Sequence, residues 1–190
     1  MSDLEDYLNK LIRKKNIFRE QSFKNLKQVL VNLKIKKPNK LISITGTNGK
    51  GSTAEILSRV LAKNKYEVGL LTSPHLVKFN ERIRINNENI DDSEMLNCLE
   101  EVDKLKDSKE LNFYQIIAAA AFLFFSKKKL DVWILEVGLG GRLDPANYFD
   151  ADISVITKIA LDHENILGKG VENIGREKAG IFRTNQTVIF

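Results

Sequence analysis

The spacing of hydrophobic residues changes near residue 40. Before it, apolar side chains recur at helical spacing over residues 3–14 and 22–34, which predicts two short helices. Pro38 ends this part, because proline cannot continue a helix. We therefore expect residues 1–40 to form helices packed on a domain made by residues 41–190.

From residue 41 onward, predicted strands and helices alternate. Strands are predicted at 41–45, 66–72, 130–136, 153–157 and 187–190, a β-hairpin at 82–90, and helices at 52–65, 92–106, 113–127 and through 176–180. The nearly all-apolar run Leu130–Glu136 is typical of a strand buried on both faces of a parallel sheet. This order predicts a doubly wound, mostly parallel α/β sheet. The sequence stops within its last predicted strand, so we expect a fragment of a longer protein.

Composition limits the classes of partner. The chain has 190 residues and a formal net charge of +5, but its lysines are scattered over runs such as Lys34–Lys37 and Lys127–Lys129, so we expect no nucleic-acid partner. The single cysteine, Cys98, excludes an internal disulfide framework and indicates a reducing compartment. The longest apolar run, Ile116–Phe125, is too short to span a bilayer, and the acidic start is no signal peptide. We expect a cytoplasmic protein without membrane association.

The segment Leu41–Ser52 (LISITGTNGKGS) predicts a phosphate-binding loop between a strand and a helix. Three glycines allow backbone N–H groups to converge on an anion: Gly46, Gly49 and Gly51. Lys50 could reach terminal phosphates, and the hydroxyl of Ser52 or Thr53 could ligate Mg²⁺. The pattern G-x-x-x-x-G-K-S/T is not met literally, since fewer residues separate the glycines and another glycine follows the lysine. The alternative is an ordinary glycine-rich turn.

Two further residues suggest a metal site. Glu136 is a carboxylate that ends a buried strand beside the glycine loop, as a metal–nucleotide site requires; its alternative role is a structural partner of Arg142. His163 follows a strand and has Asp162 beside it, but imidazole is an unusual Mg²⁺ ligand, so the residues leave its role open. Lys178 is predicted, from the residues alone, to be a solvated helix lysine.

Four motifs together resemble the folylpolyglutamate synthase/dihydrofolate synthase family, within the Mur-ligase superfamily of ATP-dependent amide ligases. They are TGTNGKGS at 45–52, TSPHL..FNERI at 72–83, LEVGLGGRLD..N at 135–147, and LDH at 161–163 with REKAGI at 176–181. The resemblance implies a P-loop domain of the Mur-ligase central-domain type, with the family's smaller C-terminal domain absent from this chain. It also implies a monomer.

The implied reaction is the ATP-dependent addition of L-glutamate to a pteroate or folate carboxylate through an acyl phosphate, with ATP and Mg²⁺ as cofactors. The implied substrates are ATP, L-glutamate and either dihydropteroate or a reduced folate. Because the family's second domain completes the nucleotide site, we expect the isolated fragment to turn over nothing.

The resemblance also implies residue roles. The residues expected to cradle the ATP phosphates are Thr47, Asn48, Gly49, Lys50, Gly51 and Ser52. The expected metal ligands are Ser73, Glu136 and His163, and the expected catalytic residues are Lys50, His163 and Lys178. Lys178 matches a lysine that family members carbamylate, which turns an ammonium into a carboxylate-like group. The expected substrate-binding residues are Phe113, Leu143 and Asp144.

The chain departs from the family at the start of the helix at 113–127. The common Thr-Phe-Phe-Glu-like stretch reads Asn112, Phe113, Tyr114, Gln115 here, and Ala118 replaces a threonine. The departures leave open whether dihydropteroate, a reduced folate or both are substrates. Alternative functions are another Mur-type amino-acid ligase, a P-loop NTPase without ligase activity, and a non-catalytic binding protein.

Overall fold

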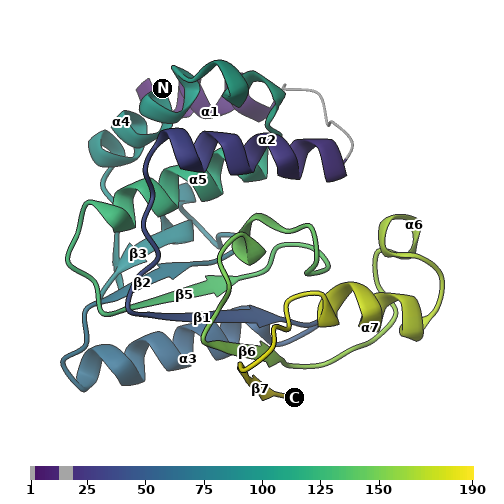
Figure 1. The fold of residues 1–190 in the computed structure, drawn as a ribbon. Coiled ribbons are helices and arrows are strands. Elements are labelled where there is room, and N and C mark those ends of the chain that lie inside the picture. The colour runs from purple at the N-terminus through teal and green to yellow at the C-terminus, as the bar shows by residue number, and fades with distance from the viewer. Residues whose placement is uncertain (1–2, 13–18) are drawn as a thin grey trace.

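A seven-stranded sheet forms the centre of the molecule in the computed structural model, which describes residues 3–12 and 19–190 (Figure 1). The strand order is β4-β3-β2-β5-β1-β6-β7. The strands are β1 (Lys40–Thr45), β2 (Val68–Leu71), β3 (Ile83–Ile85), β4 (Glu88–Asn89), β5 (Val132–Glu136), β6 (Ile153–Ile156) and β7 (Thr187–Ile189). The pairs from β2 to β7 are parallel, and β3 and β4 add an antiparallel hairpin at the β2 edge. The predicted doubly wound, mostly parallel sheet is confirmed.

Helices cover both faces of this sheet (Figure 1). The α-helices are α1 (Asp3–Ile12), α2 (Arg19–Asn32), α3 (Lys50–Lys63), α4 (Asp92–Asp103), α5 (Phe113–Ser126), α6 (Glu164–Leu167) and α7 (Val171–Ala179). Three short 3₁₀ helices, η1 (Phe79–Arg82), η2 (Lys106–Glu110) and η3 (Pro145–Asn147), were not predicted. The helix predicted at 3–14 is described as far as Ile12, and its last two residues lie outside the described part. Helix α3 begins at Lys50, so the lysine and Gly51 of the phosphate loop lie in its first turn.

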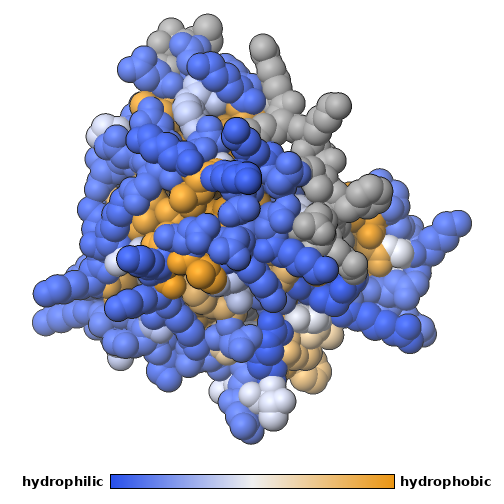
Figure 2. All heavy atoms as spheres, turned by 45° about the horizontal axis from the view of Figure 1, so that its top comes forward, coloured by the Kyte–Doolittle hydropathy of each residue, from blue (hydrophilic) through white to orange (hydrophobic). Residues whose placement is uncertain are grey.

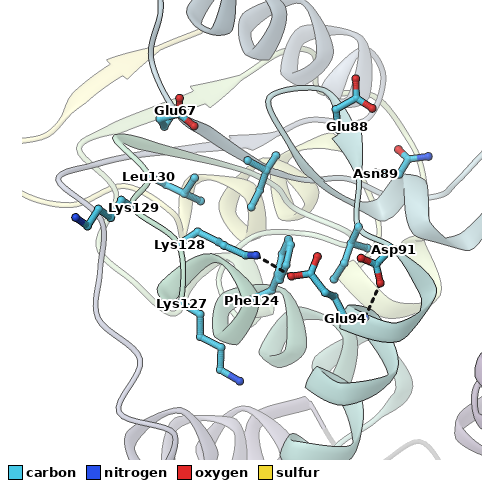
Figure 3. A pocket seen from close by; sticks show the side chains of 12 residues that line it. Glu67, Glu88, Asn89, Asp91, Glu94, Phe124, Lys127, Lys128, Lys129 and Leu130 are labelled. Atoms are coloured by element: carbon cyan, nitrogen blue, oxygen red, sulfur yellow. Dashed lines mark hydrogen bonds and ion pairs between the residues drawn. The ribbon is translucent and has the colours of Figure 1, made fainter.

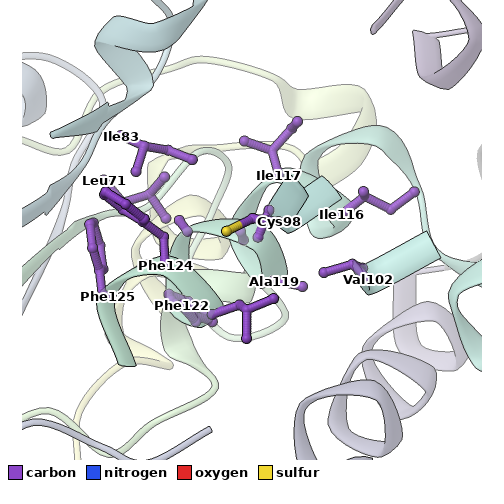
Figure 4. Packing of buried hydrophobic residues seen from close by; sticks show 14 of the residues in the cluster. Leu71, Ile83, Cys98, Val102, Ile116, Ile117, Ala119, Phe122, Phe124 and Phe125 are labelled. Carbon is purple, nitrogen blue, oxygen red and sulfur yellow. The ribbon is translucent and has the colours of Figure 1, made fainter. Parts of the chain in front are cut away.

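The two faces of the central strands are covered by different helices. In β1, Leu41 belongs to the core beneath α5, whereas Ile42 and Ile44 pack in a second cluster with Ala54 of α3. Because both faces are covered, the strands read as continuous apolar runs rather than alternating ones. Figure 4 shows the larger core, where the Cys98 thiol lies among apolar side chains of α5, and burial raises its pKa. This fits a packing role for Cys98.

The N-terminal helices share the larger core. Helix α1 buries Leu4, Leu8 and Leu11, and α2 buries Leu26 and Leu30, in the same cluster as α5. The division of the chain at residue 40 stays a prediction. The surface over this helical layer is mainly hydrophilic, with apolar side chains visible between the polar ones (Figure 2). Within residues 3–12 and 19–190, none of the helices has the length and apolar character needed to cross a bilayer.

The β3–β4 hairpin forms as its sequence predicts. Asn86 and Asn87 adopt positive φ angles of 51° and 71°, a conformation that asparagine tolerates better than most residues and that two-residue hairpin turns require. The hairpin pairs β3 with β2, so the loop from Ser73 to Glu81 is held at the carboxyl end of β2. This placement brings the SPHL motif to the edge of the sheet where the phosphate loop lies.

Candidate active site

The glycine loop lies between β1 and α3. Gly49 has φ 85° and caps the helix, and Gly46 has φ 151° where a Cβ atom would overlap the Thr157 hydroxyl. Both positions therefore require glycine. The free amides of the loop and first turn lie at the positive end of a 14-residue helix, which is an arrangement that binds phosphate.

The segment after β6, residues 157–160, holds this loop in place through hydrogen bonds. Thr157 Oγ1 donates to the Asn48 carbonyl at 2.7 Å, and the Thr47 amide donates to the Lys158 carbonyl at 2.5 Å. Thr47 Oγ1 donates to the Ala160 carbonyl at 3.1 Å. An ordinary connecting turn has no need of such bracing, so these bonds favour the phosphate-binding alternative over the plain turn.

Thr157→Val is expected to weaken MgATP binding about tenfold, because the isosteric side chain leaves the Asn48 carbonyl without its donor and lets the loop relax. Isothermal titration with MgATP measures the effect. Thr187→Val, on the exposed strand β7, is the matched control and should bind as the original protein does. Unchanged affinity in the Thr157 variant would show that the clamp does not shape the loop.

Two lysines share one carbonyl of the loop. Lys50 Nζ donates to the carbonyls of Gly46 and Thr47 at 3.0 and 3.2 Å, and Lys178 Nζ donates to the Gly46 carbonyl at 2.8 Å. Lys178 is only 4% exposed, so the prediction of a solvated helix lysine is wrong. Burial first, and then the positive charge of Lys50, lower the pKa of Lys178 to about 8, against a smaller opposing effect of Asp162.

This shift has a measurable consequence for stability. The pKa of Lys178 falls from 10.5 to about 8 on folding, so between these values the unfolded chain binds the additional proton and stability rises with pH. Between pH 8 and pH 10.5 in CO₂-free buffer, the free energy of unfolding of the original protein is expected to rise by up to about 3 kcal/mol relative to that of Lys178→Met. Urea unfolding at several pH values tests this; parallel pH profiles for the two proteins would contradict it.

Glu136 is positioned by β5 beside the start of α3. It is 3% exposed, and its Oε2 accepts a hydrogen bond from the Ser73 amide at 2.9 Å. A Cβ atom at Gly51 would lie 3.5 Å from both carboxylate oxygens, so the carboxylate approaches the phosphate loop closely. Arg142, the partner that the alternative role of Glu136 would require, forms an ion pair with Glu177 at 2.9 Å.

The electrostatics of Glu136 suit a bound cation. Burial raises the pKa of this carboxyl group, while the Ser73 hydrogen bond and the charges of Lys50 and Arg82 lower it. Desolvation prevails, so the ionised form is held at a cost that a divalent cation would offset. In the described part of the chain, no three His, Cys, Asp or Glu side chains form a metal-binding group. Ser73, whose amide contacts Glu136, and His163 both line the adjoining cleft, and the carboxylate and hydroxyl oxygens among these residues fit Mg²⁺.

A cleft of about 850 Å³ adjoins this site. Six of the residues expected to bind or react line it: Lys50, Ser73, Phe113, Leu143, Asp144 and His163. The other expected residues do not line it, but two of them contact residues of the site: Glu136 accepts from the Ser73 amide, and Lys178 shares the Gly46 carbonyl with Lys50. His163 caps α6 with φ 49°, and its half-exposed ring lies 3.6 Å from an Asp162 oxygen. The structure therefore brings six of the thirteen predicted site residues to one cavity.

The expected substrate wall is held by backbone contacts. The carboxylate of Asp144 accepts from the Leu139 and Ala146 amides at 3.0 and 2.9 Å, so it fixes the loop after β5 and the start of η3. Phe113 contacts Phe79 edge-on, with ring centroids 5.9 Å apart. These contacts preorganise one side of the cleft.

Among the cleft residues that were not predicted to bind substrate, cofactor or metal are Arg82, Tyr114 and Gln115. Arg82 Nε donates to His75 Nδ1 at 3.0 Å, and burial lowers the pKa of its guanidinium. Tyr114 Oη donates to the Glu136 carbonyl at 3.1 Å. Arg82 belongs to the FNERI motif, and Tyr114 and Gln115 begin the helix predicted at 113–127. The one signal in the sequence was that charged or polar side chains stand next to a predicted strand and at a predicted helix start.

A second groove, of about 710 Å³, lies at the opposite end of the sheet, by the amino ends of β2 and β5 (Figure 3). Lys128 forms an ion pair with Glu94 at 2.7 Å, and the Asp91 carboxylate caps α4 by accepting from the Glu94 amide at 2.7 Å. None of the predicted site residues lines this groove.

Comparison with known proteins agrees with this geometry. The model of the Mur ligase middle domain matches residues 44–189. Dihydrofolate synthase/folylpolyglutamate synthase of Escherichia coli K12 is 42% identical over 162 residues, which are 85% of this chain and 38% of that protein. The protein of the same description from Buchnera aphidicola subsp. Schizaphis graminum is 41% identical over 96% of this chain and 43% of its own length.

Solved structures give the same result. Escherichia coli FolC in complex with DHPP and ADP superposes with a TM-score of 0.90 at 37% identity, covering 99% of this chain and 46% of that chain. An FPGS–AMPPCP–folate complex superposes with a TM-score of 0.90 at 29% identity over all of this chain and 49% of that chain. The chain thus spans less than half the length of the relatives it matches. It belongs to the Mur ligase middle domain family, and the resemblance to folylpolyglutamate and dihydrofolate synthases is confirmed.

Proposed function

We propose that this chain is the nucleotide- and pteridine-binding part of an ATP-dependent ligase that adds L-glutamate to a pteroate or folate carboxylate. The observation that carries this proposal is that one cleft joins the phosphate-loop lysine, Lys50, to the wall formed by Phe113, Leu143 and Asp144. A phosphate donor and an organic carboxylate can therefore meet in it. Relatives are described with ADP, AMPPNP, Mn, L-glutamate, folate or DHPP bound, which supports the same assignment.

The proposed reaction has two balanced steps. A substrate carboxylate oxygen attacks the γ-phosphorus of ATP, the bond to the bridging oxygen breaks, and ADP leaves. The amine of L-glutamate then attacks the acyl carbon, phosphate leaves with the bonding electrons, and the amine loses a proton to form the amide. Both steps depend on positioning and on neutralising phosphate charge more than on a covalent enzyme group.

The residues divide this work. The backbone amides from Asn48 to Ser52 donate hydrogen bonds to the phosphates, and Lys50 supplies a cation beside them. The Thr47 amide is bonded to the Lys158 carbonyl and helps to hold the loop in shape. Glu136, Ser73 and His163 are the residues proposed to hold Mg²⁺, which when bound neutralises phosphate charge. We infer that Lys178 is carbamylated in the active protein. Its lowered pKa, about 8, supports this because only the neutral amine adds CO₂.

The test is phosphate release by the protein expressed from its complete reading frame, with MgATP, L-glutamate and either dihydropteroate or tetrahydrofolate. Release that requires both L-glutamate and a pteridine supports the ligase, and the pteridine that works identifies the substrate. Release that is indifferent to both would leave a P-loop NTPase and overturn the proposal.

A further inference from the structure

One cation in the cleft has no carboxylate partner. Arg82, the last residue of η1, is half-buried and lines the cleft. Within residues 3–12 and 19–190, its guanidinium takes part in no ion pair. Burial lowers the pKa of this group, against smaller opposing effects of Tyr114 and Glu136. A cation held partly away from water without a partner costs free energy, and an anionic ligand would offset that cost.

Two contacts hold the guanidinium and leave its terminal nitrogens open. Arg82 Nε donates to His75 Nδ1 at 3.0 Å, and Arg82 Cζ lies 5.0 Å from the centre of the Phe79 ring. With the described part of the chain, Nη1 and Nη2 make no hydrogen bond, and neither is a buried atom without a partner, so both are accessible. A planar guanidinium fixed at Nε and open at Nη1 and Nη2 suits a carboxylate, which accepts two parallel hydrogen bonds.

The Phe79 ring also places Arg82 beside the expected substrate wall. Phe79 contacts Phe113 edge-on, with ring centroids 5.9 Å apart, and Phe113 lines the same cleft as Arg82. The charge of Arg82 also acts on Glu136, the proposed metal ligand, whose pKa it helps to lower against the effect of burial. Arg82 therefore adjoins both the ring wall and the metal site. The loop amides and Lys50 already serve the phosphates, so the anion left for Arg82 is an organic carboxylate.

We propose that Arg82 is a further substrate-binding residue: it holds the carboxylate that is to be phosphorylated, and His75 is the positioning residue that fixes its guanidinium. This rests on the proposed function. The carboxylate and the ATP phosphates are all anionic and repel one another as they approach. A guanidinium bonded to the carboxylate offsets this repulsion and keeps the reacting oxygen in place.

The test compares two ligands that differ only in this group: dihydropteroate and the dihydropteroate derivative whose carboxylate is replaced by a carboxamide. Arg82→Met removes the guanidinium and is expected to weaken dihydropteroate binding about 30-fold, because charge-assisted hydrogen bonds are lost. Carboxamide binding should change less than about twofold, and MgATP affinity should stay the same. Arg82→Lys keeps the charge without the two parallel donors, so we expect a loss of about fivefold.

Substitutions of His75 test the positioning contact. His75→Phe removes the acceptor for Arg82 Nε and is expected to weaken dihydropteroate binding about fivefold. His75→Asn offers an amide oxygen near the former Nδ1 and should restore most of the affinity. Arg59→Met is the matched control, because Arg59 is exposed on α3, pairs with Glu55 at 2.6 Å and does not line the cleft. It should bind both ligands as the original protein does.

Binding is measured by titration calorimetry on the protein from its complete reading frame. Equal losses for the carboxylate and the carboxamide in Arg82→Met would overturn the inference, and Arg82→Lys gives the same comparison if the methionine variant does not fold. Unchanged dihydropteroate affinity, with weaker MgATP binding or a raised KM for L-glutamate, would assign Arg82 to another anion and also overturn it. His75→Asn and His75→Phe with equal losses would remove His75 from the proposal. Absence of pteridine binding in the original protein would instead overturn the proposed function.

Discussion

Lys50→Ala is expected to weaken MgATP binding at least about 100-fold and to abolish detectable ligase turnover. The side chain lies on the loop itself: its Nζ donates to the Gly46 and Thr47 carbonyls. Charge-assisted contacts to phosphate are among the strongest hydrogen bonds, and loss of one in a water-poor site costs about 10²–10³ in rate. Titration calorimetry with MgATP, and phosphate release, measure the two effects.

Lys50→Ala should also change the pKa of Lys178. The charge of Lys50 is one of the two causes that lower the pKa of Lys178, so removing it is expected to raise that pKa back toward its ordinary value. Lys63→Ala, an exposed substitution in the last turn of the same helix, controls for effects on α3. MgATP affinity unchanged in Lys50→Ala would mean that the loop is not the phosphate site, and the proposed function would fail with it.

The architecture was largely predictable because its causes are local. Fully apolar strands such as Leu130–Glu136, helical spacing elsewhere, and a glycine loop between strand and helix together predict a parallel α/β sheet. Strand ends then indicate where ligands bind, since side chains at the carboxyl ends of parallel strands share one edge. Glu136 and the glycine loop could be placed near each other by that reasoning alone.

What the sequence could not predict depends on contacts between distant segments. Lys178 has the helical neighbours of a solvated residue, and it is buried because α7 lies against the loop 132 residues away. Gln115 lies in the first turn of the helix predicted at 113–127, but its side chain accepts a hydrogen bond from the Ser22 hydroxyl, 93 residues earlier. Likewise, Arg142 pairs with Glu177 from α7. Such pairings follow from the packed fold and not from local pattern.

Glu136→Gln is expected to lower ligase turnover about 10²–10³-fold while leaving the protein as stable or more stable without ligands. The carboxyl pKa is raised by burial, so at neutral pH the folded protein bears a cost for keeping Glu136 ionised. Glutamine is isosteric, can still accept from the Ser73 amide at 2.9 Å in the original protein, and carries no charge. Loss of activity with undiminished stability is the pattern of a residue retained for function.

The measurement that separates this from a structural role is thermal unfolding with and without Mg²⁺ and ATP. Mg²⁺ together with ATP should raise the unfolding temperature of the original protein. In Glu136→Gln, the additional rise caused by Mg²⁺ should be lost. Glu172→Gln, exposed in the first turn of α7, is the control and should respond like the original protein. If Glu136→Gln instead unfolds at a lower temperature and keeps its metal response, the buried carboxylate supports the fold and the metal is held elsewhere.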